Sequence, residues 1–289
     1  MANVLKPSWS KPSSILFASE IPANEKAFSF ALAQAVEFGA ELILFHAYDR
    51  LVVSASERSS VLYYDSTAAF RAEVEHLEPL AKRARDAGVE CEIVVRPGLA
   101  ADQILTYQRE RQIDRIVMGT HSPGPIGKLL VGSVAEAVLR KASVPVFIVG
   151  PEVVNWAYGN FSLRSILCGI SLHESSSMVA AFAAELAAKH NARLILQHVI
   201  LPQERQEVLA GRSIHQIENG LVSLVPVALR GRIAVQTIVA LGDPTEELLL
   251  QARSLQAGLI VLGAQGASAF AAVARLGVVY TMQIGRAHV

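Results

Sequence analysis

Short apolar runs alternate with helix-like segments along the whole chain. In the first half, five runs rich in Val, Ile and Leu predict strands, and the segments between them place apolar residues three and four positions apart, as in Phe28, Leu32 and Ala35. This alternation predicts an open parallel sheet with helices on both faces, an α/β fold. The expected strands are residues 14–18, 41–47, 90–96, 115–119 and 144–149, and the expected helices are 25–38, 67–87, 101–111 and 133–141.

The second half of the chain repeats the pattern of the first. Ser14-Ile-Leu recurs as Ser165-Ile-Leu, and the run Leu-Ile-Leu leads two residues later to His46 and again to His198. A histidine at the end of an apolar strand is more often a hydrogen-bonded residue than a ligand-binding one, and we interpret both in that way. The repeat predicts domains at residues 1–150 and 164–289, joined by a linker at 151–163.

A loop rich in glycine and proline separates the fourth strand of the first half from its last helix. Gly119 ends the strand, and Gly132-Ser133 stands before the helix. Backbone N–H groups at a helix N-terminus and the helix dipole both favour a phosphate, and parallel sheets bind ligands beyond the carboxyl ends of their strands. The loop therefore predicts nucleotide binding. Ser133 and Glu136 also have the spacing of a capping box, which explains the serine without a ligand.

These features resemble a tandem universal stress protein, with two domains of that family in one chain. In nucleotide-binding members, strand four is followed by glycine, two residues, glycine, nine residues, and then glycine with serine or threonine. The same spacing here reads Gly119, Ser122, Gly132 and Ser133. Ser122 replaces a glycine, and serine adopts positive φ less readily. The resemblance implies two tandem, open, five-stranded parallel sheets that are Rossmann-like and similar to the adenine nucleotide alpha hydrolases.

The resemblance also implies the cofactor, which is ATP, with or without Mg²⁺, at the strand ends of the first domain. Glu20 stands where the family has an aspartate that contacts the adenine or the ribose. The glutamate side chain keeps the carboxylate but is one methylene longer. Ala47 corresponds to the residue that lines the base, and Met118 and Gly119 correspond to the ribose side.

The phosphate side is implied to lie where the glycine-rich loop meets the helix. Gly132, Ser133 and Val134 would bind phosphate through their N–H groups and the serine hydroxyl. The hydroxyl of Ser122 is a further donor. Lys128 is a mobile cation four residues before Gly132 and a further candidate, with a solvated surface lysine as the competing interpretation.

The second domain departs from the family pattern. Gly263 is retained, but Gly277 is followed by Val278, and Ser171 stands where the carboxylate is expected. We expect a degenerate partner domain without nucleotide. No run like 144–149 closes this half, so we expect its last strand to be missing and the strand at 144–149 to lack a partner. The last residues, 283–289, can be encoded by a common sequencing-adapter read, and we expect the natural gene to continue differently.

The composition of the chain limits the kinds of molecule that it is expected to bind. The chain has 26 Lys and Arg against 26 Asp and Glu, which gives no electrostatic reason to expect nucleic acid or an anionic membrane. It has no apolar run of about 18 residues and no signal-peptide core, and only two cysteines, a pattern typical of a cytoplasmic protein. The expected partners are an adenine nucleotide, the other domain of the same chain, and a second copy in a homodimer.

Two functions stay open. One is an ATP-binding module for stress response or signalling, and the sequence leaves open whether it slowly hydrolyses the ATP. The other is a dimerisation or interaction scaffold of the same family that binds no nucleotide. An enzyme of this fold is disfavoured, because the residues after the first strand, 19–24, carry neither a Ser-Gly-Gly-x-Asp-Ser loop nor a His-x-Gly-His pair.

Overall fold

The computed structural model describes residues 11–48, 66–120, 132–150, 163–171, 176–202, 205–211, 213–263 and 278–282. Ser122, Lys128, nearly all of the expected linker and residues 283–289 lie outside these ranges. Expectations about them therefore stay predictions.

The first half forms five parallel strands in the order β3-β2-β1-β4-β5. The strands are β1 (Ser14–Ala18), β2 (Glu41–Tyr48), β3 (Cys91–Pro97), β4 (Arg115–Gly119) and β5 (Val146–Val149). The helices are α2 (Glu25–Phe38), α3 (Ser66–Asp86), α4 (Ala100–Glu110) and α5 (Ser133–Lys141). Each expected strand and helix is present, with ends that differ by at most two residues.

The second half repeats this arrangement, with its strands in the order β8-β7-β6-β9-β10. Its strands are β6 (Ser165–Gly169), β7 (Arg193–Ile200), β8 (Val235–Leu241), β9 (Leu259–Gly263) and β10 (Val278–Met282). Its helices are α6 (Ser176–His190), α7 (Arg205–Gly211), α8 (Ile214–Ser223), the 3-10 turn η1 (Val227–Leu229) and α9 (Pro244–Ser254). The parallel α/β fold expected from the repeat is confirmed.

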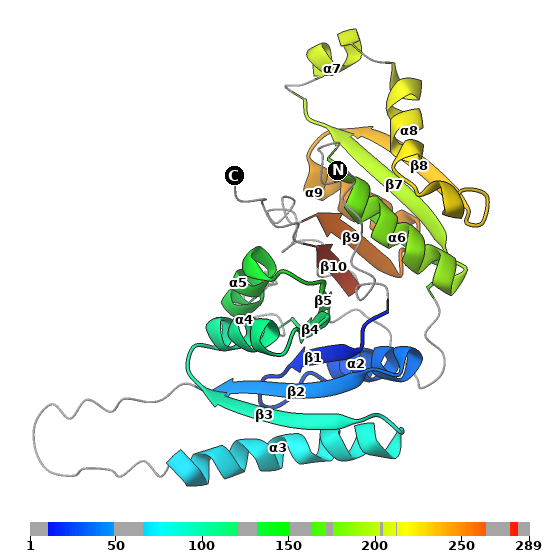
Figure 1. Ribbon diagram of the computed structural model, residues 1–289. Helices are drawn as coiled ribbons and strands as arrows, with labels where there is room; N and C mark the ends of the chain where they lie inside the picture. The colour runs from blue at the N-terminus through cyan, green and yellow to red at the C-terminus, as the bar shows by residue number, and fades with distance from the viewer. Residues whose placement is uncertain are drawn as a thin grey trace, which may run out of the picture.

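The two halves share one sheet, which corrects two expectations. β10 lies parallel to β9, in the position of a fifth strand, and antiparallel to β5, with Val278 opposite Val149 and Thr281 opposite Val146. Residues 278–282 therefore occupy the place of the strand that we expected to be missing, and β5 has a partner. The result is a ten-stranded sheet in place of two separate ones, running from β3 at the foot of Figure 1 to β8 near its top.

The sheet is buried on both faces, which explains the continuous apolar runs of its strands. Along β1, Ile15 and Phe17 face one apolar cluster and Leu16 faces the other, and all three are fully buried. Helices α2, α3, α6 and α8 contribute to the first cluster, whereas α4, α5 and α9 contribute to the second. Buried strands on this plan read as unbroken Val, Ile and Leu.

Helices α2 and α6 meet across the junction of the two halves. Lys189 on α6 lies over the ring of Phe38 on α2, with Nζ 3.3 Å from the ring centroid and 3.4 Å from Glu37 Oε1. Arg115, at the start of β4, is fully buried beneath this contact, where it donates to Gln34 and lies 4.9 Å from the Phe38 ring. Polar and cation–ring contacts thus join the halves beside the β5–β10 pairing.

Candidate functional site

A cavity of about 150 Å³ opens at the carboxyl ends of β1, β2 and β4. β1 pairs with β2 on one side and with β4 on the other, so their ends lie next to each other. This is the point where strand order reverses in an open parallel sheet, and ligands of such folds bind there. The lining residues are Ala18, Ser19, Glu20, Ile21, Asn24, Phe45, His46, Ala47, Ala100, Ile104, Met118, Gly119, Thr120 and Val134.

The cavity brings together most of the site residues expected from the sequence. Glu20, Ala47, Met118, Gly119 and Val134 all line it, although they come from four separate segments of the chain. Two further candidates, residues 132 and 133, form the start of α5 next to Val134, outside the lining. The last two, at positions 122 and 128, belong to the loop outside the described residues.

His46 ties the ends of β1 and β2 together at the cavity wall. Its Nδ1 lies 2.9 Å from the carbonyl oxygen of Ser19, and because a carbonyl only accepts, Nδ1 carries the hydrogen. Its Nε2 lies 3.8 Å from Glu73 Oε2 on α3. His198 repeats the first contact at 2.8 Å from Ile170 O. The expectation of a hydrogen-bonded residue at the strand end is confirmed in both halves.

Asn24 links the first helix to the end of β4. Its Oδ1 accepts from the N–H of Ala27 at 3.0 Å, which caps α2, and its Nδ2 donates to Thr120 O at 3.1 Å. A β-carbon at Gly119 would lie 2.6 Å from this side chain, closer than real contacts allow. Packing against Asn24 thus requires glycine at position 119, whatever the cavity binds.

The start of α5 differs from the capping box expected from the sequence. Gly132 is the N-cap residue and makes no side-chain capping bond, and Ser133 is already the first residue of the helix. Glu136 instead pairs with Arg140 at 2.7 Å, one turn further along. The capping-box interpretation of Ser133 is therefore wrong. No side chain among the described residues caps the first-turn N–H groups of α5, the groups that bind anions at helix N-termini.

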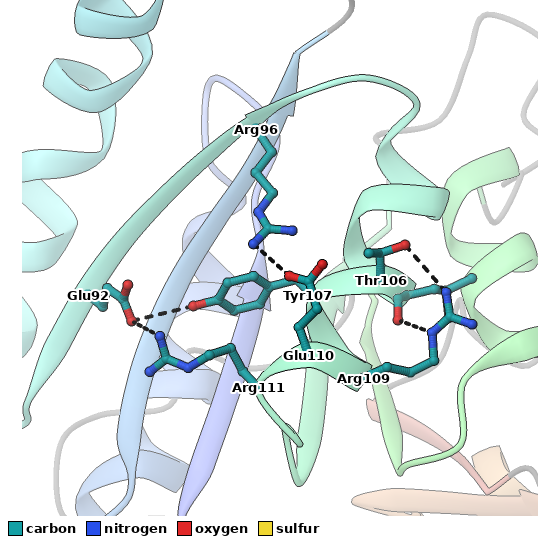
Figure 2. A network of polar contacts seen from close by, with 8 residues as sticks. Glu92, Arg96, Thr106, Tyr107, Arg109, Glu110 and Arg111 are labelled. Carbon is teal, nitrogen blue, oxygen red and sulfur yellow. Dashed lines mark hydrogen bonds and ion pairs between the residues drawn. The ribbon is translucent and has the colours of Figure 1, made fainter.

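Helix α4 forms a firm wall of the cavity through Ala100 and Ile104. One turn beyond Ile104, Tyr107 is 3% exposed and its ring lies 5.3 Å from that of Phe45, which also lines the cavity. Figure 2 shows polar side chains enclosing the tyrosine: Arg96 lies 4.6 Å over its ring and its hydroxyl donates to Glu92 at 3.4 Å. Burial raises the pKa of Tyr107, so its hydroxyl stays protonated and the side chain stays uncharged in this packing.

Two lining residues that sequence reasoning missed are Asn24 and Thr120. Asn24 had a local signal, since asparagine before a helix is a common N-cap. Its contact with Thr120 had no such signal, because the two residues are 96 positions apart in the chain.

Among the described residues, no group of three or more His, Cys, Asp or Glu could hold a metal ion.

The equivalent place in the second half has a different character. Gly263 ends β9 as Gly119 ends β4, but among the described residues a β-carbon there would meet only Val179, at an ordinary 3.5 Å. Gln197 stands where the first half has Phe45. It is 1% exposed, and within the described part of the chain neither its Nε2 nor its Oε1 has a hydrogen-bond partner. An amide therefore lies buried and unsatisfied where the first half has an aromatic ring.

The comparisons with known proteins agree with this architecture. The model of the universal stress protein family matches residues 13–150 and again 162–288, so the chain belongs to that family as a tandem member. Universal stress protein YxiE of Bacillus subtilis is 29% identical over 133 residues, which cover 44% of this chain and 90% of that protein.

A solved structure shows the same fold over the whole chain. A universal stress protein from Archaeoglobus fulgidus aligns over 97% of this chain and 99% of its own, with a TM-score of 0.70 and 19% identity. A universal stress protein in complex with cAMP aligns with 43% of this chain and 97% of its own, at 21% identity and a TM-score of 0.33. The whole-chain alignment establishes a tandem fold of two units.

Proposed function

We propose that the first half binds an adenine nucleotide, ATP in particular, and acts as a stress-response or signalling module. The observation that carries the proposal is the cavity at the strand ends, because it gathers five residues that the family pattern had named separately: Glu20, Ala47, Met118, Gly119 and Val134. The described helices include none long and apolar enough to cross a membrane.

The lining suits the parts of a nucleotide. Ala47, Met118 and Ile104 supply apolar walls for a flat base, and the Glu20 carboxylate is an acceptor for an amino or ribose hydroxyl group. At the other end, the α5 N-terminus offers first-turn N–H groups without a side-chain cap. We infer that the triphosphate extends there, with the Ser133 hydroxyl and the loop residues Ser122 and Lys128 as further contacts.

We also propose that ligand binding, rather than rapid turnover, is the role of this site, and that the cytoplasm is where it acts. Both cysteines are free thiols. Burial raises the pKa of Cys91 to about 11, and Cys168 is fully buried, so neither is poised as a nucleophile. Reduced, unreactive cysteines suit a reducing compartment.

Titration calorimetry of the full chain with ATP and Mg²⁺ tests the proposal. The parent protein should bind one ATP per chain, and Ala47→Phe should abolish binding by filling the cavity. Val199→Phe, at the matching position of the second half, is the control and should bind as the parent does. Ser133→Ala should weaken binding, whereas Ser213→Ala, which removes the N-cap of α8, should not. Absence of binding at millimolar ATP contradicts the proposal.

A second candidate function rests on Gly119. Since Asn24 requires that glycine for packing, its presence does not depend on a phosphate, and a scaffold that binds no nucleotide would keep it too. The same titration separates the two functions. A scaffold shows no heat of binding in the parent or in any variant, and no adenine absorbance is released when the purified protein is denatured.

A further inference from the structure

Strand β8 ends the ten-stranded sheet, and within the described part of the chain it pairs only with β7 (Figure 1). The carbonyl of Ala234 accepts from Leu194 N at 2.9 Å, and the N–H of Gly242 donates to Ile200 O at 3.1 Å. Backbone groups of one residue point to the same side of a strand and alternate along it. Even-numbered residues of β8 therefore face β7, and the backbone groups of odd-numbered ones face outward.

The opposite edge of the sheet is protected in ways that β8 is not. Helices pack beside both edge strands, α3 along β3 and α8 along β8, but β3 itself contains Glu92, Arg96 and Pro97. β8 reads Val-Gln-Thr-Ile-Val-Ala-Leu, without a charge, a proline or a glycine. Natural proteins guard exposed edges with charges, prolines or covering segments, because an unguarded edge pairs with another strand. The composition of β8 is that of a strand meant to pair.

We propose that β8 pairs antiparallel with β8 of a second copy of this chain, centred on Ile238, to join two ten-stranded sheets. In this register Val235 lies opposite Leu241 and Thr237 opposite Val239. All four have outward-facing backbone groups, so each pair exchanges two hydrogen bonds. The pairing also covers apolar side chains that the single chain leaves half-exposed, among them Leu241 at 43% exposure.

The charges that flank β8 favour a second copy over an unrelated strand. Arg232, just before the strand, is exposed, as are Asp243 and Glu246 just after it. An antiparallel arrangement places the basic residue before β8 of one copy beside the acidic residues after β8 of the other. The two-fold symmetry repeats this contact at both ends of the strand pair. The central seven residues carry no charge that would repel its own copy. The edge is thus complementary to itself, as a two-fold symmetric interface requires.

Cysteine cross-linking tests the register. Residues facing each other in a pair without mutual hydrogen bonds have α-carbons about 4.5 Å apart, close enough for a disulfide. Ile238→Cys, in a Cys91→Ser background, should cross-link two chains on mild oxidation. Val94→Cys at the centre of β3, whose backbone groups also face the neighbouring strand, is the matched control in the same background and should stay monomeric on denaturing gels. Equal cross-linking of both variants, or of neither, overturns the proposal.

Light scattering across a concentration series tests the interface without a cysteine. Thr237→Pro removes an outward N–H but no bond to β7, and should weaken the dimer about tenfold or more through two lost hydrogen bonds. Ile93→Pro makes the same change on β3, whose outward residues are also odd-numbered, and should leave the dimer intact. A chain that stays monomeric throughout, or a dimer that survives Thr237→Pro but not Ile93→Pro, contradicts the proposal. If either proline variant fails to fold, the cross-link decides.

Discussion

The Asn24 side chain occupies the space that a β-carbon at Gly119 would need, with Cγ and Nδ2 both 2.6 Å from that position. Asn24 cannot easily turn aside, because its amide is hydrogen-bonded at both ends, to Ala27 and to Thr120. This contact fixes the loop after β1 against the end of β4. It thereby sets two walls of the cavity at once.

Gly119→Ala is expected to lower the free energy of unfolding by about 1–3 kcal/mol, the usual range for overpacking a tight site. Gly263→Ala is the matched control in the second half. Among the described residues its β-carbon would meet only Val179, at an ordinary contact distance, so we expect this substitution to be neutral or slightly stabilising. Denaturant unfolding of the two variants measures the difference, and an equal loss of stability in both would refute this account of Gly119.

The same contact predicts a favourable coupling between two substitutions. Asn24→Gly removes the atoms that a β-carbon at position 119 would meet, and glycine at an N-cap costs only a few tenths of a kcal/mol. The double variant Asn24→Gly with Gly119→Ala should therefore be more stable than the sum of the single effects predicts. A double-mutant cycle from unfolding curves measures the coupling, and strict additivity would mean that the two residues do not compete for space.

Gln197→Met should stabilise the protein by about 1–3 kcal/mol. The substitution keeps the length of the side chain and removes two buried polar atoms that have no hydrogen-bond partner among the described residues. Gln34→Met is the control, because Gln34 is also buried but accepts a hydrogen bond from Arg115, so its loss should destabilise. Thermal unfolding should show opposite shifts in melting temperature; a lower melting temperature for Gln197→Met would show that the amide is needed.

Acid should weaken the junction between the halves through His190. Its side chain is 4% exposed, and burial, with Lys189 and Arg115 nearby, lowers its pKa from 6.5 to about 4. The unfolded chain therefore binds a proton between these pH values that the folded chain does not, so stability falls as pH drops through this range, by about 3 kcal/mol in full.

The measurement compares unfolding of the parent and His190→Gln between pH 7 and 4. The variant should lose less stability on acidification. Glu37, whose pKa burial raises, acts in the opposite direction and lies 3.7 Å from His190 Nε2, so the difference between the two proteins includes any change in its titration. His76→Gln serves as the control, since the His76 side chain is 60% exposed on α3. Parallel curves for parent and His190→Gln would exclude the histidine as the cause.

Local patterns were enough to predict the framework of the first half. β1 and β4 match their expected bounds, because each is an apolar run that a polar residue or a glycine ends. The cavity could be placed for the same reason, since the strand ends fix its position in any open parallel sheet. The resemblance to universal stress proteins then named five of the residues that line it.

The corrections come from contacts that sequence position does not reveal. β10 was missed because its five residues stand before a polar tail, and it becomes a strand by pairing with both β5 and β9. The capping-box spacing predicts Ser133 as an N-cap, whereas the helix begins at Ser133 itself, after Gly132. The role of Asn24 depends on residues about a hundred positions away.

The antiparallel pairing of β5 with β10 determines which way each half of the molecule points. Because all strands within a half are parallel, every strand of the first half runs opposite to every strand of the second. The carboxyl ends of the two sets of strands therefore lie on opposite rims of the sheet. A ligand in the first half therefore faces away from the equivalent place in the second.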